Sequence, residues 1–350
     1  MAVRVLIVDD SALMRQMLTS LLHGDDLHVV GAAENPLVAR EMIKALNPDV
    51  LTLDVEMPRM DGLDFLSRLM SLRPMPVVMI SSLTQEHAEA ALRALELGAV
   101  DCIAKPQTDL AKGMEAMRED MRSRILAAAK ARVRPLTSRT PKTKPAHGAV
   151  PFTSSEKIVV IGASTGGVEA LTEVLCALPA ASPGILVVQH MPPLFTASFA
   201  KRLDGLAALS VVEARDGTRI MPGHVHIAPG SMHLELARSG ADYMCRVHDG
   251  PLVSGHRPSV DVLFHSAARC AGANALGVIL TGMGRDGAEG LLKMRQTGSA
   301  TVGQDESSCV VYGMPKAAYD LGGVAQQLPL DRIAESILSY SHEARQALRV

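Results

Sequence analysis

A chain of 350 residues is long for a single hydrophobic core, so we expect two domains. Hydrophobic residues make up 47% of the sequence and charged residues 21%, which excludes a largely disordered protein. The formal net charge of −2 excludes a strong overall attraction to nucleic acid or to anionic membrane surfaces.

The first part of the chain alternates between aliphatic runs and amphipathic helical patterns. Ser11 is placed to cap the first helix, and Gly98 to end the helix expected from about 85 to 97. Five strand–helix units predict a doubly wound parallel α/β sheet of flavodoxin-like type over residues 1–125. The expected strands are 3–8, 27–32, 50–53, 77–80 and 100–104.

Three acids lie at the ends of these strands. Asp9 and Asp10 end the first strand and Asp54 ends the third, and these strands are neighbours in a doubly wound sheet. Because close carboxylates repel one another, we expect a hard cation, Mg²⁺, between them. Ser81 and Lys105 add a hydroxyl and a positive charge, which suits Asp54 to accept a phosphoryl group. The alternative is that the acids merely cap the following helices.

Residues 1–125 resemble the receiver domain of two-component regulators. The resemblance implies Asp54 as phosphoacceptor, Mg²⁺ ligation by Asp9, Asp10 and Asp54, and a histidine kinase as phosphodonor. It implies Ser81 and Lys105 as switch residues. Receivers often carry an aromatic residue three positions before the lysine, where this chain has Cys102. The matching residues are Asp9, Asp10, Asp54, Met57-Pro58, Asp61-Gly62, Ser81 and Lys105-Pro106.

The pattern changes after the last helix of the first domain. Residues 126–155 finish that helix and then carry prolines and basic residues without an apolar period, which predicts a linker. Residues 156–350 return to an α/β pattern and predict a second doubly wound, Rossmann-like parallel sheet. Within it, the glycine-rich and proline-rich stretch 211–253 predicts hairpins at one edge. The clearest strands are 158–161, 185–188 and 275–280, and the clearest helices are 166–178, 260–270 and 331–348.

A serine lies in a glycine-rich turn after the first strand of the second domain, in Gly162-Ala163-Ser164-Thr165-Gly166-Gly167. A sharp strand-to-helix turn exposes the hydroxyl of Ser164 beside the free N–H groups of a helix start. The serine is therefore a candidate nucleophile. The same turn is compatible with the phosphates of a dinucleotide, but that function needs an acid after the next strand, where the chain has Gln189-His190.

The partners that a nucleophilic serine needs lie at neighbouring strand ends. His190 follows the strand 185–188 and is the candidate base for Ser164. Asp286 lies in the turn after the strand 275–280 and is the candidate acid that orients the imidazole. All three turns lie at the carboxyl edge of one predicted sheet, where open α/β sheets bind their ligands.

Donors for a developing oxyanion are also available. The backbone N–H of Thr165 follows the nucleophile, and Met283 lies between two glycines in the facing turn. Each residue also has a simpler interpretation, because a lone histidine is often just packed and Asp286 is placed to cap a helix. Asp216 and Asp261 are rival acids.

The receiver, the linker and four motifs of the second domain together resemble the CheB family of chemotaxis methylesterases. The resemblance implies Ser164, His190 and Asp286 as the catalytic triad, with no cofactor at the hydrolase site. It implies demethylation of glutamate methyl esters and deamidation of glutamines on cytoplasmic helices of methyl-accepting chemoreceptors, which release methanol or ammonia. The chemotaxis histidine kinase would be the phosphodonor. The motifs are Gly162–Gly167, Gln189–Pro193, His256–Asp261 and Thr281–Gly287.

Two other functions stay open. A receiver often controls a DNA-binding output, but the second half of this chain has no compact basic helical pattern. A nucleotide-binding oxidoreductase is the other alternative. Five scattered cysteines are typical of reduced thiols in a cytoplasmic protein, and no apolar run is long enough for membrane insertion. We expect neither nucleic acid nor membrane lipid as a partner.

Overall fold

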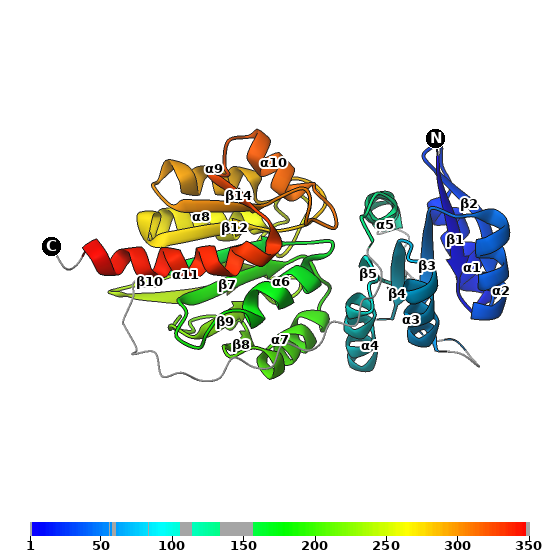
Figure 1. The fold of residues 1–350 in the computed structure, drawn as a ribbon, viewed down its shortest axis with the longest axis horizontal. Helices are drawn as coiled ribbons and strands as arrows, with labels where there is room; N and C mark the ends of the chain where they lie inside the picture. The colour runs from blue at the N-terminus through cyan, green and yellow to red at the C-terminus, as the bar shows by residue number, and fades with distance from the viewer. Residues whose placement is uncertain are drawn as a thin grey trace. The chain divides into compact units, whose positions relative to one another are not determined.

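The computed structural model describes residues 2–55, 57, 61–82, 84–105, 114–133 and 157–347. The chain forms two compact units, Met1–Thr140 and Pro141–Val350 (Figure 1). Most of the predicted linker, from residue 134 onward, lies outside the described residues, as do Pro58 and Pro106 of the receiver motifs. None of the described helices is long and apolar enough to cross a bilayer.

Within its described residues, the first unit contains one sheet of five parallel strands in the order β2-β1-β3-β4-β5. This is the flavodoxin-like doubly wound order, and it confirms the predicted fold. The strands are β1 Val3–Val8, β2 Leu27–Ala33, β3 Val50–Asp54, β4 Val77–Ser81 and β5 Asp101–Ala104. The helices are α1 Ala12–Leu22, α2 Pro36–Leu46, α3 Gly62–Leu72, α4 Gln85–Glu96 and α5 Met114–Ala129.

Local sequence explains the helix ends of this unit. The hydroxyl of Ser11 accepts a hydrogen bond from the Met14 N–H at 3.3 Å and caps α1, as predicted. Asn35 caps α2 through two backbone N–H groups, and Pro36 follows it at the first helical position. Gly98, with φ of 98°, supplies the left-handed residue that ends the turn after α4.

In the described part of the second unit, seven parallel strands form a sheet in the order β14-β13-β12-β6-β7-β9-β8. The order reverses at β6, which lies between β7 and β12. The strands are β6 Ile158–Ala163, β7 Gly184–Gln189, β8 Ser210–Glu213, β9 His224–Ile227, β10 His233–Ser239, β11 Asp242–His248, β12 Ala275–Ile279, β13 Ala300–Gln304 and β14 Gln326–Leu328. The helices are α6 Gly167–Cys176, α7 Phe195–Leu206, α8 Val260–Cys270, α9 Ala288–Gln296, α10 Met314–Asp320 and α11 Leu330–Ala347, with a 3-10 helix at Gly272–Asn274.

The edge of this sheet differs in part from the prediction. Hairpins were expected across 211–253, and β10 and β11 do pair antiparallel. However, β8 and β9 are parallel members of the main sheet, and β9 pairs with both β7 and β8. The hairpin prediction is therefore wrong for this pair. The ten residues between β8 and β9 cross over instead of turning back, and glycine and proline alone do not distinguish these two connections.

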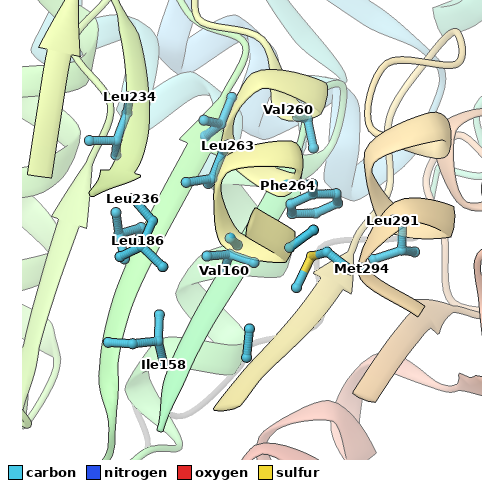
Figure 2. Packing of buried hydrophobic residues seen from close by; sticks show 14 of the residues in the cluster. Ile158, Val160, Leu186, Leu234, Leu236, Val260, Leu263, Phe264, Leu291 and Met294 are labelled. Carbon is cyan, nitrogen blue, oxygen red and sulfur yellow. The ribbon is translucent and has the colours of Figure 1, made fainter. Parts of the chain in front are cut away.

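The core of the second unit brings α8 against the middle of the sheet. Figure 2 shows Leu263 and Phe264 of α8 lying between side chains of the sheet, of β10 and of α9. Phe264 is completely buried. Gly162 at the end of β6 lies so close to Val260, at the start of α8, that a side chain there would overlap it. The packing thus places the N-terminus of α8 beside the turn that carries Ser164.

Candidate active site

Ser164 and His190 follow adjacent parallel strands. Ala163 and Gln189 are paired in the ladder between β6 and β7, so the next residue of each strand leaves the same edge of the sheet. The His190 N–H donates to the Ala163 carbonyl at 3.1 Å, and the Ser164 N–H donates to the Thr281 carbonyl at 3.0 Å. These two bonds tie the serine turn to both neighbouring strands, at the switch point where such sheets bind ligands.

His190 and Asp286 form a hydrogen bond. The distance from His190 Nε2 to Asp286 Oδ2 is 2.8 Å, and the two side chains are 9% and 1% exposed. Asp286 also accepts from the Ser259 hydroxyl at 2.7 Å and from the N–H groups of Val260 and Asp261 at 2.7 and 3.1 Å. Four donors therefore converge on one buried carboxylate, and two of them are free N–H groups at the start of α8.

These donors keep Asp286 ionised. Burial opposes the charge, but the hydrogen bond and charge of His190, the Val260 N–H and the Ser259 hydroxyl outweigh it and lower the pKa of Asp286 to about 2. An ionised carboxylate has no proton to donate, so His190 Nε2 carries the proton of this bond. The other ring nitrogen, Nδ1, is left without a proton in the neutral imidazole.

His190 Nδ1 is buried, and no atom of the described residues forms a hydrogen bond with it. The expected bond from the Ser164 hydroxyl is therefore not made in this conformation. Catalytic hydrogen bonds of this kind often form only when substrate is bound. In the neutral imidazole this buried nitrogen, at the strand end beside Ser164, has the lone pair that a general base requires.

The turn that contains Met283 packs directly on the serine. Gly282 lies so close that a Cβ there would be 2.8 Å from Ser164 Cβ. The Gly282 carbonyl accepts from the Gly313 and Met314 N–H groups, which fixes the backbone next to Met283. On the other side, the Thr281 hydroxyl donates to the Thr165 carbonyl at 3.0 Å. The structure thus brings the backbones of both expected oxyanion donors to the serine turn.

The receiver residues also gather at one place. Asp9, Asp10 and Asp54 each offer a carboxylate oxygen within 4.8 Å of the others. Lys105 Nζ lies 2.6 Å from Asp54 Oδ2 and 3.6 Å from Asp9 Oδ2. Burial opposes the charge of Lys105, but the hydrogen bond and charge of Asp54 outweigh it and raise the pKa of Lys105. Ser81 is buried, and its carbonyl accepts from the Lys105 N–H at 2.8 Å.

Two further receiver positions have clear structural reasons. Asp61 caps α3 by accepting from the Leu63 N–H at 3.1 Å, and a side chain at Gly62 would overlap the Asp54 carbonyl oxygen. Cys102, at the position that is often aromatic, is buried, and burial raises the pKa of its thiol to about 12. Its small side chain is a neutral thiol inside the unit and offers no ring that could swing outward.

Comparison with known proteins identifies the families to which the two units are similar. A family model described as "CheB methylesterase" matches residues 159–337, and one described as "Response regulator receiver domain" matches residues 5–118. The chain belongs to the CheB methylesterase family. This confirms the resemblance predicted from the sequence motifs, and the two matches together confirm a receiver followed by a methylesterase domain.

Relatives of the CheB family match along nearly the whole chain. A "Protein-glutamate methylesterase/protein-glutamine glutaminase" of Salmonella choleraesuis is 56% identical, covering 99% of each chain. A protein of the same name from Yersinia pseudotuberculosis is 57% identical over the same share. The crystal structure of the Thermotoga maritima CheB methylesterase catalytic domain has a TM-score of 0.52 and 41% identity, covering 53% of this chain and 99% of that one.

The rival acids of this CheB family member have other roles. Asp216 accepts from the Val247 N–H at 2.9 Å, and Asp261 accepts from the Gly290 N–H at 2.8 Å. Asp286 does act as a helix cap, as the simpler interpretation proposed. However, it accepts from the N–H groups of α8, whereas Gly287 stands at the N-cap of its own following helix, α9.

Two residues at the site were not assigned from the sequence. Ser259 donates to Asp286, and the imidazole of His256 stacks on that of His190, with ring centroids 3.9 Å apart and an interplanar angle of 13°. Both belong to the motif His256–Asp261, which contributed to the family resemblance, but neither residue had a role assigned to it. The sequence feature that could have indicated a functional role for this motif is its cluster of polar residues directly before a helix start. Nothing in the sequence pattern indicated which strand end that loop would cover.

Proposed function

We propose that Ser164, His190 and Asp286 carry out the hydrolysis that the family membership gives this chain, as a protein-glutamate methylesterase and protein-glutamine glutaminase. The observation that carries the assignment is the 2.8 Å bond between His190 and Asp286 at the strand end beside Ser164. The fused receiver makes the enzyme a response regulator of the two-component type, with a role in chemotactic adaptation.

In the first half-reaction the Ser164 hydroxyl attacks the γ-carbonyl carbon of the methylated glutamate. The new C–O bond forms as the hydroxyl proton passes to His190 Nδ1, and the carbonyl electron pair moves onto oxygen. The backbone N–H groups of Thr165 and Met283 stabilise that oxyanion. The intermediate then expels the methoxy group, which takes the proton from His190 and leaves as methanol.

The second half-reaction repeats these steps with water. Water attacks the glutamyl–Ser164 ester while His190 Nδ1 accepts its proton, and the serine oxygen leaves with that proton as glutamate is released. A glutamine side chain has nearly the same shape as the methyl ester. With glutamine, His190 protonates the leaving nitrogen and ammonia is released. Asp286 stabilises the imidazolium in every step.

The receiver unit is proposed to accept a phosphoryl group on Asp54 from a chemotaxis histidine kinase. Asp9 Oδ2 fits a cation ligand, because it is buried and no described residue donates a hydrogen bond to it. Burial raises the pKa of Asp9 despite the nearby Lys105. Asp9, Asp10 and Asp54 would hold Mg²⁺, which neutralises charge on the transferred phosphoryl group. Ser81 and Lys105 would then respond to the phosphoryl group as the switch residues.

We place the receiver at 1–125, the linker at 126–155 and the catalytic domain at 156–350. Cytoplasmic helices of methyl-accepting chemoreceptors are the proposed substrates, in a cytoplasmic setting. Without phosphorylation the receiver would restrain the hydrolase, and phosphorylation would release it. The dinucleotide alternative is not supported, because Gly166 and Gly167 pack against Val310 and Gln189.

The proposed activity is tested by comparing two serine variants of the full chain. Receptor membranes carrying labelled methyl esters are incubated with a small phosphodonor, and released methanol is counted. We expect Ser164→Ala to abolish release, whereas Ser210→Ala, at an exposed serine of β8, keeps it. Coincident thermal unfolding curves of the two variants show that the unit containing Ser164 and Ser210 is folded in both. Methanol release by Ser164→Ala at the rate of the Ser210 variant would overturn the assignment.

A further inference from the structure

The imidazole rings of His190 and His256 are stacked almost in parallel. Their centroids are 3.9 Å apart and their planes differ by 13°. His256 lies in the loop between β11 and α8. This loop is distant in the sequence from His190, which directly follows β7. In neither of the two half-reactions does His256 attack, accept a proton or donate one.

A single hydrogen bond does not fix the orientation of an imidazole ring. Among the described residues, Asp286 is the hydrogen-bond partner of the His190 ring, and the bond is made at one ring atom, Nε2. Rotation about the axis through that bond would carry Nδ1 away from the proton it must accept. A second flat ring lying 3.9 Å away and parallel blocks this rotation on one face.

The loop is built to hold His256 in place. The N–H of Val253 donates to the His256 carbonyl at 3.1 Å, and the His256 N–H donates back to the Val253 carbonyl at 2.9 Å. The two residues between them have φ of 53° for Ser254 and 79° for Gly255, as a tight two-residue hairpin turn requires. A serine held in the left-handed region is a locally unfavourable conformation that the surrounding structure maintains.

Both sides of this turn are anchored. Arg257 Nη1 donates to the Asp249 and Gly250 carbonyls at 2.8 and 3.0 Å, which closes the loop onto its own start. At the far end Ser259 donates to Asp286. Leu252, in contrast, is 63% exposed, so burial of apolar surface does not account for the loop conformation. The loop reaches the site through His256 and Ser259, which contact the base and its acid.

We propose that His256 is a positioning residue for the general base. The His256 ring fixes the plane of the His190 ring, and Asp286 fixes the position of His190 Nε2. The two contacts together keep His190 Nδ1 directed to the proton that it accepts. This inference rests on the proposed role of His190. His256 itself exchanges no proton in the reaction, and the stacking contact with His190 depends on its flat ring.

The test compares three substitutions in the full chain under phosphodonor. His256→Ala removes the ring, His256→Leu keeps bulk without a flat face, and His256→Phe keeps the flat face without nitrogens. We expect Ala and Leu to lower kcat by about 10- to 100-fold with KM unchanged, because a loosened base is misplaced for proton transfer. Phe should restore kcat to within about threefold of wild type, because stacking needs only a flat ring.

Two controls separate the possible failures. His265→Ala removes an exposed histidine of α8 and should leave kcat and KM unchanged. His190→Gln should be inactive. Turnover by that variant would overturn the proposed function, whereas an inactive His190 variant beside a fully active His256→Ala would overturn this inference alone. Equal activity of the Phe and Leu variants, or a change confined to KM, would also overturn it. The comparison of Phe with Leu decides the question even where Ala loses stability.

Discussion

Replacement of Asp286 by asparagine changes one atom at the centre of the proposed site. Oδ2 accepts from His190 Nε2 at 2.8 Å and from the Val260 N–H at 2.7 Å. Oδ1 accepts from the Ser259 hydroxyl at 2.7 Å and from the Asp261 N–H at 3.1 Å. The amide of asparagine has one oxygen and one NH₂ group, so one of these two positions must become a donor.

The two orientations of the amide have different consequences. With NH₂ in place of Oδ2, the amide donor faces the Val260 N–H, which is also a donor. His190 Nε2 must then accept a hydrogen bond, which moves the ring proton to Nδ1. With NH₂ in place of Oδ1, the Ser259 hydroxyl can turn to accept, and the one conflict is with Asp261, the longest of the four bonds. The second orientation should therefore prevail, and His190 keeps its proton on Nε2.

The expected loss is then that of the charge alone. Burial raises the pKa of Asp286, but the interaction with His190 and the hydrogen bonds from Val260 and Ser259 outweigh it and lower this pKa from 3.8 to about 2. This shift corresponds to roughly 2 kcal/mol of preference for the carboxylate. Loss of a charge interaction of this order beside the imidazolium should lower kcat about 30-fold. A reversed tautomer would cost about 10⁴-fold, as in other serine–histidine–aspartate enzymes.

The assay is methanol release from labelled receptor membranes by the full chain under phosphodonor, with kcat and KM measured separately. Asp216→Asn is the matched control, because this exposed acid accepts from the Val247 N–H and should leave kcat unchanged. A loss below about threefold for Asp286→Asn would refute the role of the carboxylate. A loss of 10⁴-fold would refute the predicted orientation of the amide.

Two further outcomes follow from the buried groups. Removal of Mg²⁺ by a chelator should abolish phosphorylation of Asp54 and the stimulation by phosphodonor, while basal methanol release persists; loss of basal release would contradict a metal-free hydrolase site. Burial, with a smaller effect of His224, lowers the pKa of His226 from 6.5 to about 4. The unfolded chain therefore binds more protons between these values, and stability falls as pH drops through that window. At pH 5 this costs about 2 kcal/mol relative to pH 7.5, measured by urea unfolding of the full chain. His226→Leu should remove that loss and His28→Gln, at an exposed site on β2, should keep it; equal pH dependence in both variants would contradict the assignment.

The sequence predicted the parallel sheets and the residues at their carboxyl edges because both depend on local pattern. An aliphatic run fixes a strand, and the next polar residue leaves it at the edge where parallel strands meet. Ser164, His190 and Asp9 directly follow such runs, Asp54 is the last residue of one, and Asp286 lies in the turn after β12. Their positions at the two edges could therefore be inferred without knowledge of the full topology.

Features that depend on distant contacts could not be predicted in this way. The pairing of β8 with β9 in parallel depends on how the chain between them crosses over. The capping of α8 by Asp286 depends on the packing of Gly162 against Val260. The choice of His190 Nδ1 as the base nitrogen follows from which nitrogen faces the acid, and a residue type alone does not specify this.

Ser164 as the nucleophile is tested most directly with a phosphonofluoridate, a serine-directed probe that mimics the tetrahedral intermediate. The adduct that it leaves is located by mass spectrometry. The full chain is treated, digested and mapped, in parallel with His190→Gln. We expect a single stable adduct on the peptide that contains Ser164, and its loss in the histidine variant. An adduct on another serine, with Ser164 unmodified while methanol release stops, would show that Ser164 is not the nucleophile.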